Sequence, residues 1–141
     1  MLNLDSKPGI AGGSQEKVFN YITDFRNFAL LLPEERFTDV KISKEEISFN
    51  LAGLGKVGLR IHEHTPCTKV TIKSTEESSA GFTFVIYLDQ AGEQQTRVKM
   101  QLEANLNMFL EMMARDPLQQ FLDLMVDKLG AVDFTGPNQQ K

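Results

Sequence analysis

The sequence predicts an α+β fold in which a curved antiparallel sheet of about seven strands wraps a long C-terminal helix. Between residues 37 and 106, apolar and polar residues alternate in short runs separated by turn residues, which is typical of strands with one buried face. From residue 116 to residue 130, apolar residues instead recur every three or four positions, which indicates one amphipathic helix. Since the sheet and the helix each have one apolar face, each can bury that of the other.

The composition limits the classes of protein to consider. The chain has 141 residues, so we expect a single domain over residues 1–134, followed by a polar tail at 135–141. A domain of this size buries roughly 68% of the surface that its unfolded chain exposes. The net charge is −4 and no basic stripe is present, so nucleic acid is not an expected partner.

The expected location is the cytoplasm. No run of residues approaches the roughly 18 apolar residues that a membrane-spanning helix needs, so no transmembrane segment is expected. The start of the chain also lacks the basic and apolar regions of a signal peptide. Cys67 is the one cysteine, which excludes an internal disulfide and a cysteine-based zinc site and agrees with a reducing compartment.

The N-terminal part is expected to hold one strand followed by two short helices. Leucines alternating with polar residues predict a strand over residues 2–11. Ser14 is a suitable N-cap for a first helix that ends near Asp24. A short second helix or 3₁₀ turn then runs up to Pro33, which cannot continue it.

The remaining strands follow one another through short turns. Because short turns join neighbouring strands, we expect each strand to pair antiparallel with the next. The apolar positions that predict them are Val40 and Ile42; Ile47, Phe49 and Leu51; Val57, Leu59 and Ile61; Val70 and Ile72; Phe82, Phe84, Ile86 and Leu88; and Val98, Met100, Leu102, Ala104 and Leu106.

The C-terminal helix has start and stop signals of its own. Asp116 can cap it, Pro117 suits the first helical position, and Gly130 can end it in the left-handed conformation. Its predicted buried stripe is Leu118, Phe121, Leu122, Met125 and Leu129. The methionine-rich stretch before it, residues 107–115, is predicted as a separate short helix that plugs one end of the domain.

Three segments carry a resemblance to a known superfamily: SQEKVFNYITDFRNFALLLPE, GLGKVGLRIHEHTP and MMARDPLQQFLDLMVDKL. Together with the order of strand, two helices, meander and long helix, they resemble the helix-grip fold of the START, polyketide cyclase and plant pathogenesis-related (SRPBCC) proteins. The resemblance covers nearly the whole chain and is closest to small bacterial members of unassigned function. It implies a cavity between the long helix and the sheet, which in many members holds an apolar molecule. No catalytic residue set is shared across the superfamily, so none is carried over.

The leading hypothesis is a noncatalytic carrier or sensor of an apolar small molecule, such as a lipid or a polyketide-like compound, with no cofactor. The ligand would lie between the long helix and the inner face of the sheet, against apolar side chains. The expected lining residues are Phe28, Leu31, Phe49, Leu59, Ile61, Phe84, Ile86, Met100, Met113, Phe121 and Met125. The methionines of the 107–115 stretch are expected in this interior, where flexible side chains suit an adaptable site.

Two alternatives remain open. A cyclase or dehydratase would need an inward acid or base, and only Tyr21, Glu63 and Glu111 are candidates, so no catalytic residue is assigned. Alternatively, the core is filled and the protein is an interaction module. Val85 and Tyr87 then lie on the outer face of the sheet and suggest a partner or a weak homodimer.

The histidines and the cysteine do not form a recognisable site. His62 and His64 lie two apart on one strand, which would suit a metal, but they share the solvent face with Arg60. Cys67 lies in a turn without a neighbouring histidine in the sequence. We therefore assign no metal site.

A truncation distinguishes a cavity from a filled core. If Met125 lines a cavity, Met125→Ala only enlarges an existing void. The free energy of unfolding should then fall by less than about 2 kcal/mol, the low edge of the range for a packed methionine. Urea denaturation measures the loss, and a value above about 3 kcal/mol would instead indicate a filled core.

Overall fold

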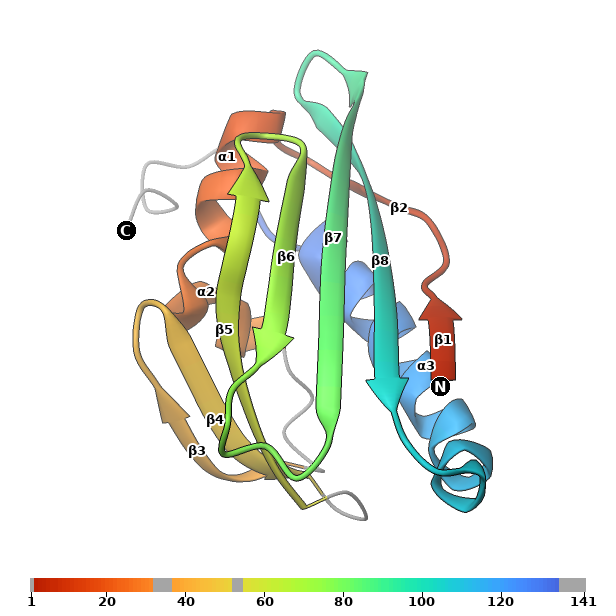
Figure 1. Cartoon of the computed structure of the whole chain (residues 1–141). Helices are drawn as coiled ribbons and strands as arrows, with labels where there is room; N and C mark the ends of the chain where they lie inside the picture. Colours follow the sequence, from red (N-terminus) through yellow and green to blue (C-terminus); the bar gives the residue numbers. More distant parts are fainter. Residues whose placement is uncertain (1, 32–36, 52–54, 135–141) are drawn as a thin grey trace.

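Figure 1 shows a computed structural model of the chain, which describes residues 2–31, 37–51 and 55–134. In chain order the elements are β1 (Leu2–Asp5), β2 (Gly9–Ala11), α1 (Gln15–Ile22), α2 (Phe25–Phe28), the 3₁₀ helix η1 (Ala29–Leu31), β3 (Phe37–Ile42), β4 (Glu46–Leu51), β5 (Gly55–Thr65), β6 (Lys69–Ser74), β7 (Gly81–Gly92), β8 (Gln95–Asn105) and α3 (Met108–Gly130).

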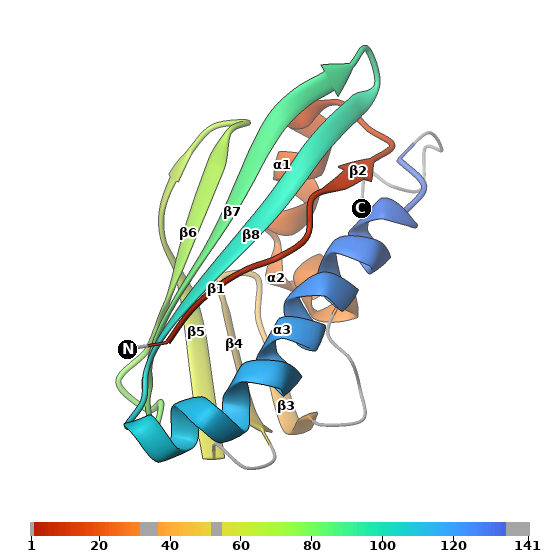
Figure 2. The same cartoon turned by 90° about the vertical axis from the view of Figure 1, so that its right-hand side faces the viewer.

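The strands form one antiparallel sheet in the order β1-β8-β7-β6-β5-β4-β3, with β2 also pairing with β8. The predicted meander of hairpins from β3 to β8 is confirmed. The helices lie on one side of this curved sheet (Figure 2). Below, the inner face is the face that they cover, where Val70, Ile86 and Met100 are fully buried.

The predicted strand over residues 2–11 is in fact two strands, so the sheet has eight strands instead of about seven. Pro8 lies in the break and has no N–H group to donate to β8. Ser6 maintains the link to β8, because its N–H donates to the Met100 carbonyl and its hydroxyl accepts from the Met100 N–H. The register against β8 shifts by one residue across the break, since Leu4 of β1 pairs with Leu102 and Gly9 of β2 with Val98.

The first short helix starts as predicted, and a short second helix follows it as predicted. The Ser14 hydroxyl caps α1 by accepting from the Lys17 N–H, and the helix ends at Ile22. Asp24 then caps α2, which continues into η1. The expected stop at Pro33 lies outside the described residues.

The C-terminal helix differs from the prediction at both ends. It is one helix that starts at Met108, capped by Asn107, and Pro117 lies inside it instead of at its first turn. A proline in a helix interior costs about 3 kcal/mol, and burial of Ala114 and Leu118 on either side offsets this cost. Gly130 is still helical, and the cap is Ala131 in the right-handed conformation, so the predicted left-handed stop is wrong.

Helix α3 packs against β1, β2 and β8. The Lys7 N–H donates to Asp123 Oδ1 at 2.8 Å, and the Lys7 amine lies 2.9 Å from Asp127, which raises the pKa of that amine. Gln119 donates to the Asp5 carbonyl at 2.8 Å. The connection between β1 and β2 is therefore bonded to one side of α3 along more than a turn.

Gly9 in β2 permits the closest approach of the sheet to this helix. A Cβ atom built on Gly9 would lie 2.2 Å from Cγ1 of Val126, a distance that real atoms do not adopt. Any side chain at position 9 must therefore displace α3 or Val126.

We expect Gly9→Ala to reduce the free energy of unfolding by about 1–3 kcal/mol, the usual cost of overpacking a core. Adding Val126→Ala should recover part of this loss, because the second truncation makes room for the new methyl group. Gly12→Ala is the matched control, since a Cβ there meets nothing within 4 Å. Urea denaturation of the four variants measures the coupling, and strictly additive losses would contradict the close contact.

Candidate functional site

The predicted lining residues lie on the inner side of the fold, with one exception. Phe28, Ile86 and Met100 are fully buried, whereas Ile61 and Phe121 are half-buried and packed against the core. The parity of the strands and the stripe of α3 therefore place these side chains between the sheet and the helices, as expected. Whether a ligand touches them is a separate question.

Met113 is the exception. It is 60% exposed, and Met108 and Met112 are exposed as well. The prediction that these methionines lie in the interior is wrong, because the stretch does not fold as a separate plug. It forms the first turns of α3 instead, next to the end of β8.

One part of the inner region is a filled core. A side chain that lines a void wide enough for a water molecule keeps accessible surface toward that void. Phe28, Ile86, Met100 and Met125 have none. The structure therefore favours the larger loss, about 2–5 kcal/mol, for Met125→Ala, contrary to the expectation from the sequence.

Another part of the inner face keeps some exposure. Leu59 and Phe82 are each 7% exposed, and Leu51 is half-buried. They lie where β4 ends and β5 and β7 begin, because Leu51 pairs with Gly55, and Gly81 at the start of β7 pairs with Asn105 at the end of β8. We call this region, with the buried residues Phe49 and Val57, the open inner face, because Leu51 at its margin is the half-buried member.

Helix α3 carries a second apolar stripe toward the open inner face. At about 100° per residue, one side of the helix holds what we call the side stripe: Leu110, Met113, Pro117, Phe121 and Leu124. The opposite side holds Gln119 and Val126, which contact Asp5 and approach Gly9. Since that side faces the β1–β2 edge, the side stripe faces η1 and the β3–β5 half of the sheet.

The three candidate acids and bases lie in different places. Tyr21 is half-buried on α1, where its ring meets that of Phe134 edge-on and burial raises the pKa of its hydroxyl. A β-bulge between Ile61 and Glu63 shifts the register, so that Glu63 pairs with Thr71 on the outer face. Its predicted inward parity is therefore wrong. Glu111 is half-buried in the first turn of α3.

The same bulge turns His64 toward the inner face, where it pairs with Val70. The centroid of its ring lies 5.4 Å from the centroid of the Phe19 ring on α1, and the two rings meet edge-on. His62 and His64 are both exposed. Among the described residues, no group of three His, Cys, Asp or Glu side chains could hold a metal ion.

Cys67 and Asp24 have structural roles. Cys67 adopts a positive φ of 67° in its turn, and its carbonyl accepts from the Gln15 side chain. Asp24 accepts from the Arg26 N–H and forms an ion pair with the Arg26 guanidinium at 2.6 Å. The hydrogen bond from Arg26 holds the pKa of Asp24 below its ordinary value.

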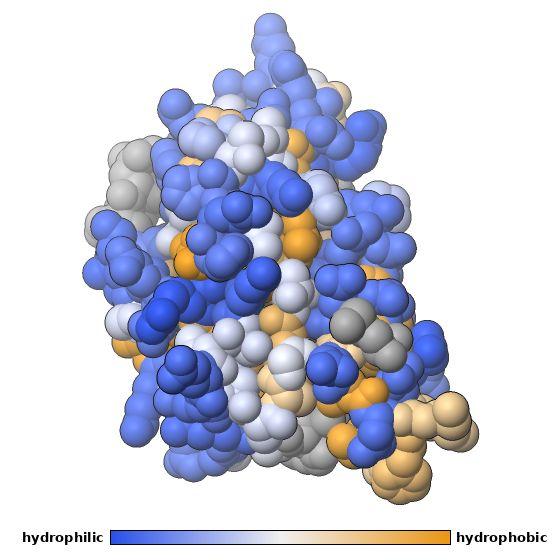
Figure 3. Space-filling model, viewed as in Figure 1, coloured by the Kyte–Doolittle hydropathy of each residue, from blue (hydrophilic) through white to orange (hydrophobic). Residues whose placement is uncertain are grey.

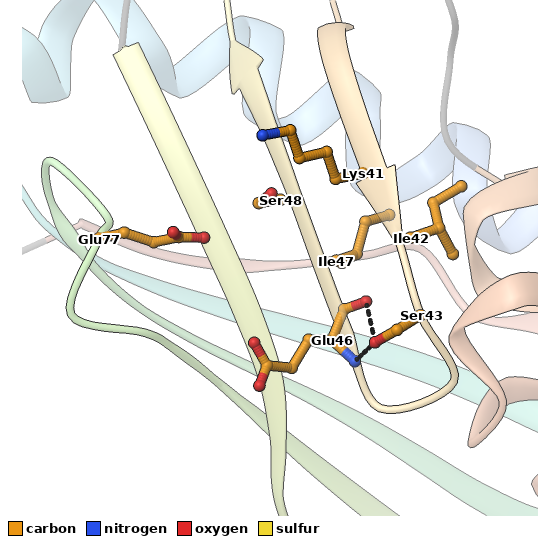
Figure 4. A pocket seen from close by; sticks show the side chains of 7 residues that line it. All are labelled: Lys41, Ile42, Ser43, Glu46, Ile47, Ser48 and Glu77. Atoms are coloured by element: carbon orange, nitrogen blue, oxygen red, sulfur yellow. Dashed lines mark hydrogen bonds between the residues drawn. The ribbon is translucent and has the colours of Figure 1, made fainter.

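A depression of about 190 Å³ lies on the outer side of the β3–β4 hairpin (Figure 4), lined by Lys41, Ile42, Ser43, Glu46, Ile47, Ser48 and Glu77. Its carboxylates already have partners, since Glu46 pairs with Arg60 and Glu77 with Lys56. A shallow site of this polarity does not suit an apolar molecule.

No helix in the described part of the chain has the length and apolar character needed to cross a membrane. No protein-family model matches the sequence, and no curated protein matches it either.

Solved structures resemble the fold closely. A START superfamily protein from Mycobacterium smegmatis matches over 90% of this chain and 98% of its own, with a TM-score of 0.59 at 12% identity. The chain has the START-like helix-grip fold. Norcoclaurine synthase from Thalictrum, in complex with a transition-state analogue, matches over 91% of this chain and 93% of its own, with a TM-score of 0.64 at 9% identity. A conserved protein from Geobacillus kaustophilus matches over 92% of this chain and 93% of its own, with a TM-score of 0.67 at 13% identity.

In this START-like fold, part of the open inner face and most of the side stripe lie outside the predicted lining residues. Val57 has the same parity as Leu59, and Phe82 the same parity as Phe84, so alternation alone predicts both as inner-face residues. The side stripe becomes visible only when residues 108–130 are treated as one helix, because Leu110 and Met113 precede Pro117.

Stability should depend on the charge of Asp24. Because its folded-state pKa is lowered from 3.8, its carboxylate stabilises the fold above that pH, and this contribution is lost as the pH falls through the lowered value. Asp24→Asn keeps a capping oxygen without the charge. Its unfolding free energy should therefore fall less than that of the parent between about pH 4 and about pH 2. Urea denaturation at each pH measures this. Asp24→Ala should cost about 1 kcal/mol more by removing the cap, and parallel pH curves would contradict the ion pair's role.

Proposed function

We propose that this protein binds an apolar small molecule between the side stripe of α3 and the open inner face of the sheet. The observation that carries the proposal is the side stripe itself. A helix of a globular domain needs one apolar stripe for packing, and α3 uses Ala114, Leu118, Leu122 and Val126 for this purpose. The side stripe is not needed for this packing at its exposed positions, Met113 and Leu124.

The chemistry of the two surfaces supports an apolar ligand. Phe121 is half-buried, Met113 and Leu124 are exposed, and the facing positions on β4 and β5 include Phe49, Leu51 and Leu59. Binding sites for small molecules are mostly apolar surfaces with few polar groups. Met113 adds a flexible side chain that can adapt to ligands of different shape.

Binding ranks above catalysis for this chain. Norcoclaurine synthase, which shares the fold, is named as an enzyme, but at 9% identity this supports the architecture only. A catalyst needs an acid or base near its reacting group. Glu63 lies on the outer face and Tyr21 on α1, and α1 covers the β7 end near Leu88, because Gln15 donates to the Leu88 carbonyl.

The direct test is native mass spectrometry of protein purified from cells, followed by thermal shifts with a fatty acid, a fatty alcohol and a sterol. At a hundredfold excess over its dissociation constant, a ligand should stabilise the fold by about 2.7 kcal/mol. If no molecule co-purifies and none of the three raises the melting temperature, the proposal fails.

Two neighbouring positions on α3 should respond differently. Phe121 lies on the side stripe, whereas Leu122 is fully buried against the sheet. We expect Leu122→Ala to reduce the unfolding free energy by about 2–5 kcal/mol and to keep the ligand-induced shift in melting temperature. Phe121→Ala should cost less stability and abolish most of that shift. If Leu122→Ala abolished the ligand-induced shift and Phe121→Ala kept it, the ligand would bind elsewhere.

A further inference from the structure

The first two turns of α3 have their polarity reversed relative to the rest of the helix. Met108, Phe109 and Met112 are 79%, 68% and 77% exposed. In contrast, Glu111 lies two turns before Leu118, and Arg115 lies two turns before Leu122. Both charged residues therefore point to the side on which α3 is otherwise buried. An apolar surface directed outward in this way suits an external partner.

This surface lies at one end of the molecule. Helix α3 begins just after β8 ends at Asn105, at the margin of the sheet, and its first turns lie at the lower end of the helix in Figure 2. In Figure 3, an apolar cluster projects at the corner where Figure 1 shows the start of α3. Another molecule can therefore reach these turns without displacing the sheet.

We propose that these two turns form the contact of a homodimer, in which two copies pair antiparallel about a two-fold axis near Met112. A symmetric contact of this kind uses the same patch on both copies, so the patch must complement itself. Met112 lies midway between Met108 and Asp116. Antiparallel pairing about Met112 thus brings Asp116 of one copy opposite the first helical residue of the other.

The charges favour this partner over a lipid surface. Asp116 is exposed on the same side of the helix as Phe109 and Met112, and burying its carboxylate in a bilayer would be costly. In the dimer the carboxylate lies beside the N-terminus of the second helix, where the helix dipole is positive. The net charge of −4 also gives no attraction to an anionic membrane.

The area fits a weak dimer. Covering Met108, Phe109 and Met112 on both copies would remove on the order of 1,000 Å² from water, the lower limit for a specific interface. Methionines can repack at such a contact, and Phe109 supplies the large rigid side chain that central interface positions favour. We therefore expect a dimer that dissociates on dilution.

Sedimentation velocity from about 1 µM to about 1 mM, the range of dissociation constants expected for a weak dimer, should show a monomer–dimer equilibrium for the parent. Phe109→Glu and Met112→Glu should be monomeric throughout. Asp116→Lys should raise the dissociation constant about tenfold, because it places a positive charge at the second helix's N-terminus. Thermal melts confirm that each variant folds.

Two controls locate the contact. Leu30 is 69% exposed, close to the value for Phe109, but lies in η1, so Leu30→Glu should dimerise like the parent. Tyr87→Glu tests the outer face of the sheet, where Lys69 and Gln101 already contact the tyrosine, and should also dimerise. A parent that stays monomeric at all concentrations, or a dimer lost in Tyr87→Glu and kept in Phe109→Glu, would overturn the proposal. A monomeric parent that sediments with phosphatidylcholine vesicles would assign the surface to lipid instead.

Discussion

The packing of α3 against β1, β2 and β8 is the contact on which the rest of the molecule depends. An antiparallel sheet with one apolar face cannot be stable in water until something covers that face. Gly9 lets the helix come close to β2, and Lys7 and Gln119 bond the β1–β2 connection to one side of it. These contacts also determine how α3 is turned about its own axis. Because Gln119 and Asp123 are held at the edge formed by β1 and β2, the side stripe faces η1 and the β3–β5 half of the sheet.

The inner region thereby divides into two parts that differ in how fully their side chains are buried. Around Phe25, Phe28 and Met125 the side chains are fully buried, and this part carries the stability of the fold. Around Leu51 and Phe121 the side chains keep some exposure, so a change there costs less stability. In this arrangement, the residues proposed to bind a ligand and the residues that stabilise the fold are neighbours on the same helix.

The sequence predicted the fold well because its signals are local. Alternation in the strands, the Ser14 cap and the turn residues each act over a few positions, and the cap and the order of the hairpins were confirmed. Alternation failed in β3, where Val40 and Ile42 are exposed. Two errors arose where the fold overrides the local signal. In the sequence, Pro117 indicates the start of a helix, but in the structure the helix is packed on both sides of Pro117 and continues through it. The bulge after Ile61 reverses the parity of Glu63, and alternation cannot reveal a bulge.

The candidate site was predicted in part for the same reason. Inward parity identified Phe49, Leu59 and Phe84 correctly as inner-face residues. Parity cannot tell a filled core from an open one, because this depends on how the helices fill the space above the sheet. Met113 was misplaced because the start of α3 was misplaced.

The interruptions in the two outermost strands have a consequence for solubility. A long regular strand at a sheet edge offers unpaired backbone groups to other chains and can template aggregation. At one edge, β3 has a register shift between Thr38 and Lys41, and Asp39 adopts a positive φ of 53°. At the other edge, the break at Pro8 divides the pairing with β8 into the short strands β1 and β2. Neither edge presents a continuous row of donors and acceptors, so the sheet resists growth by addition of further strands.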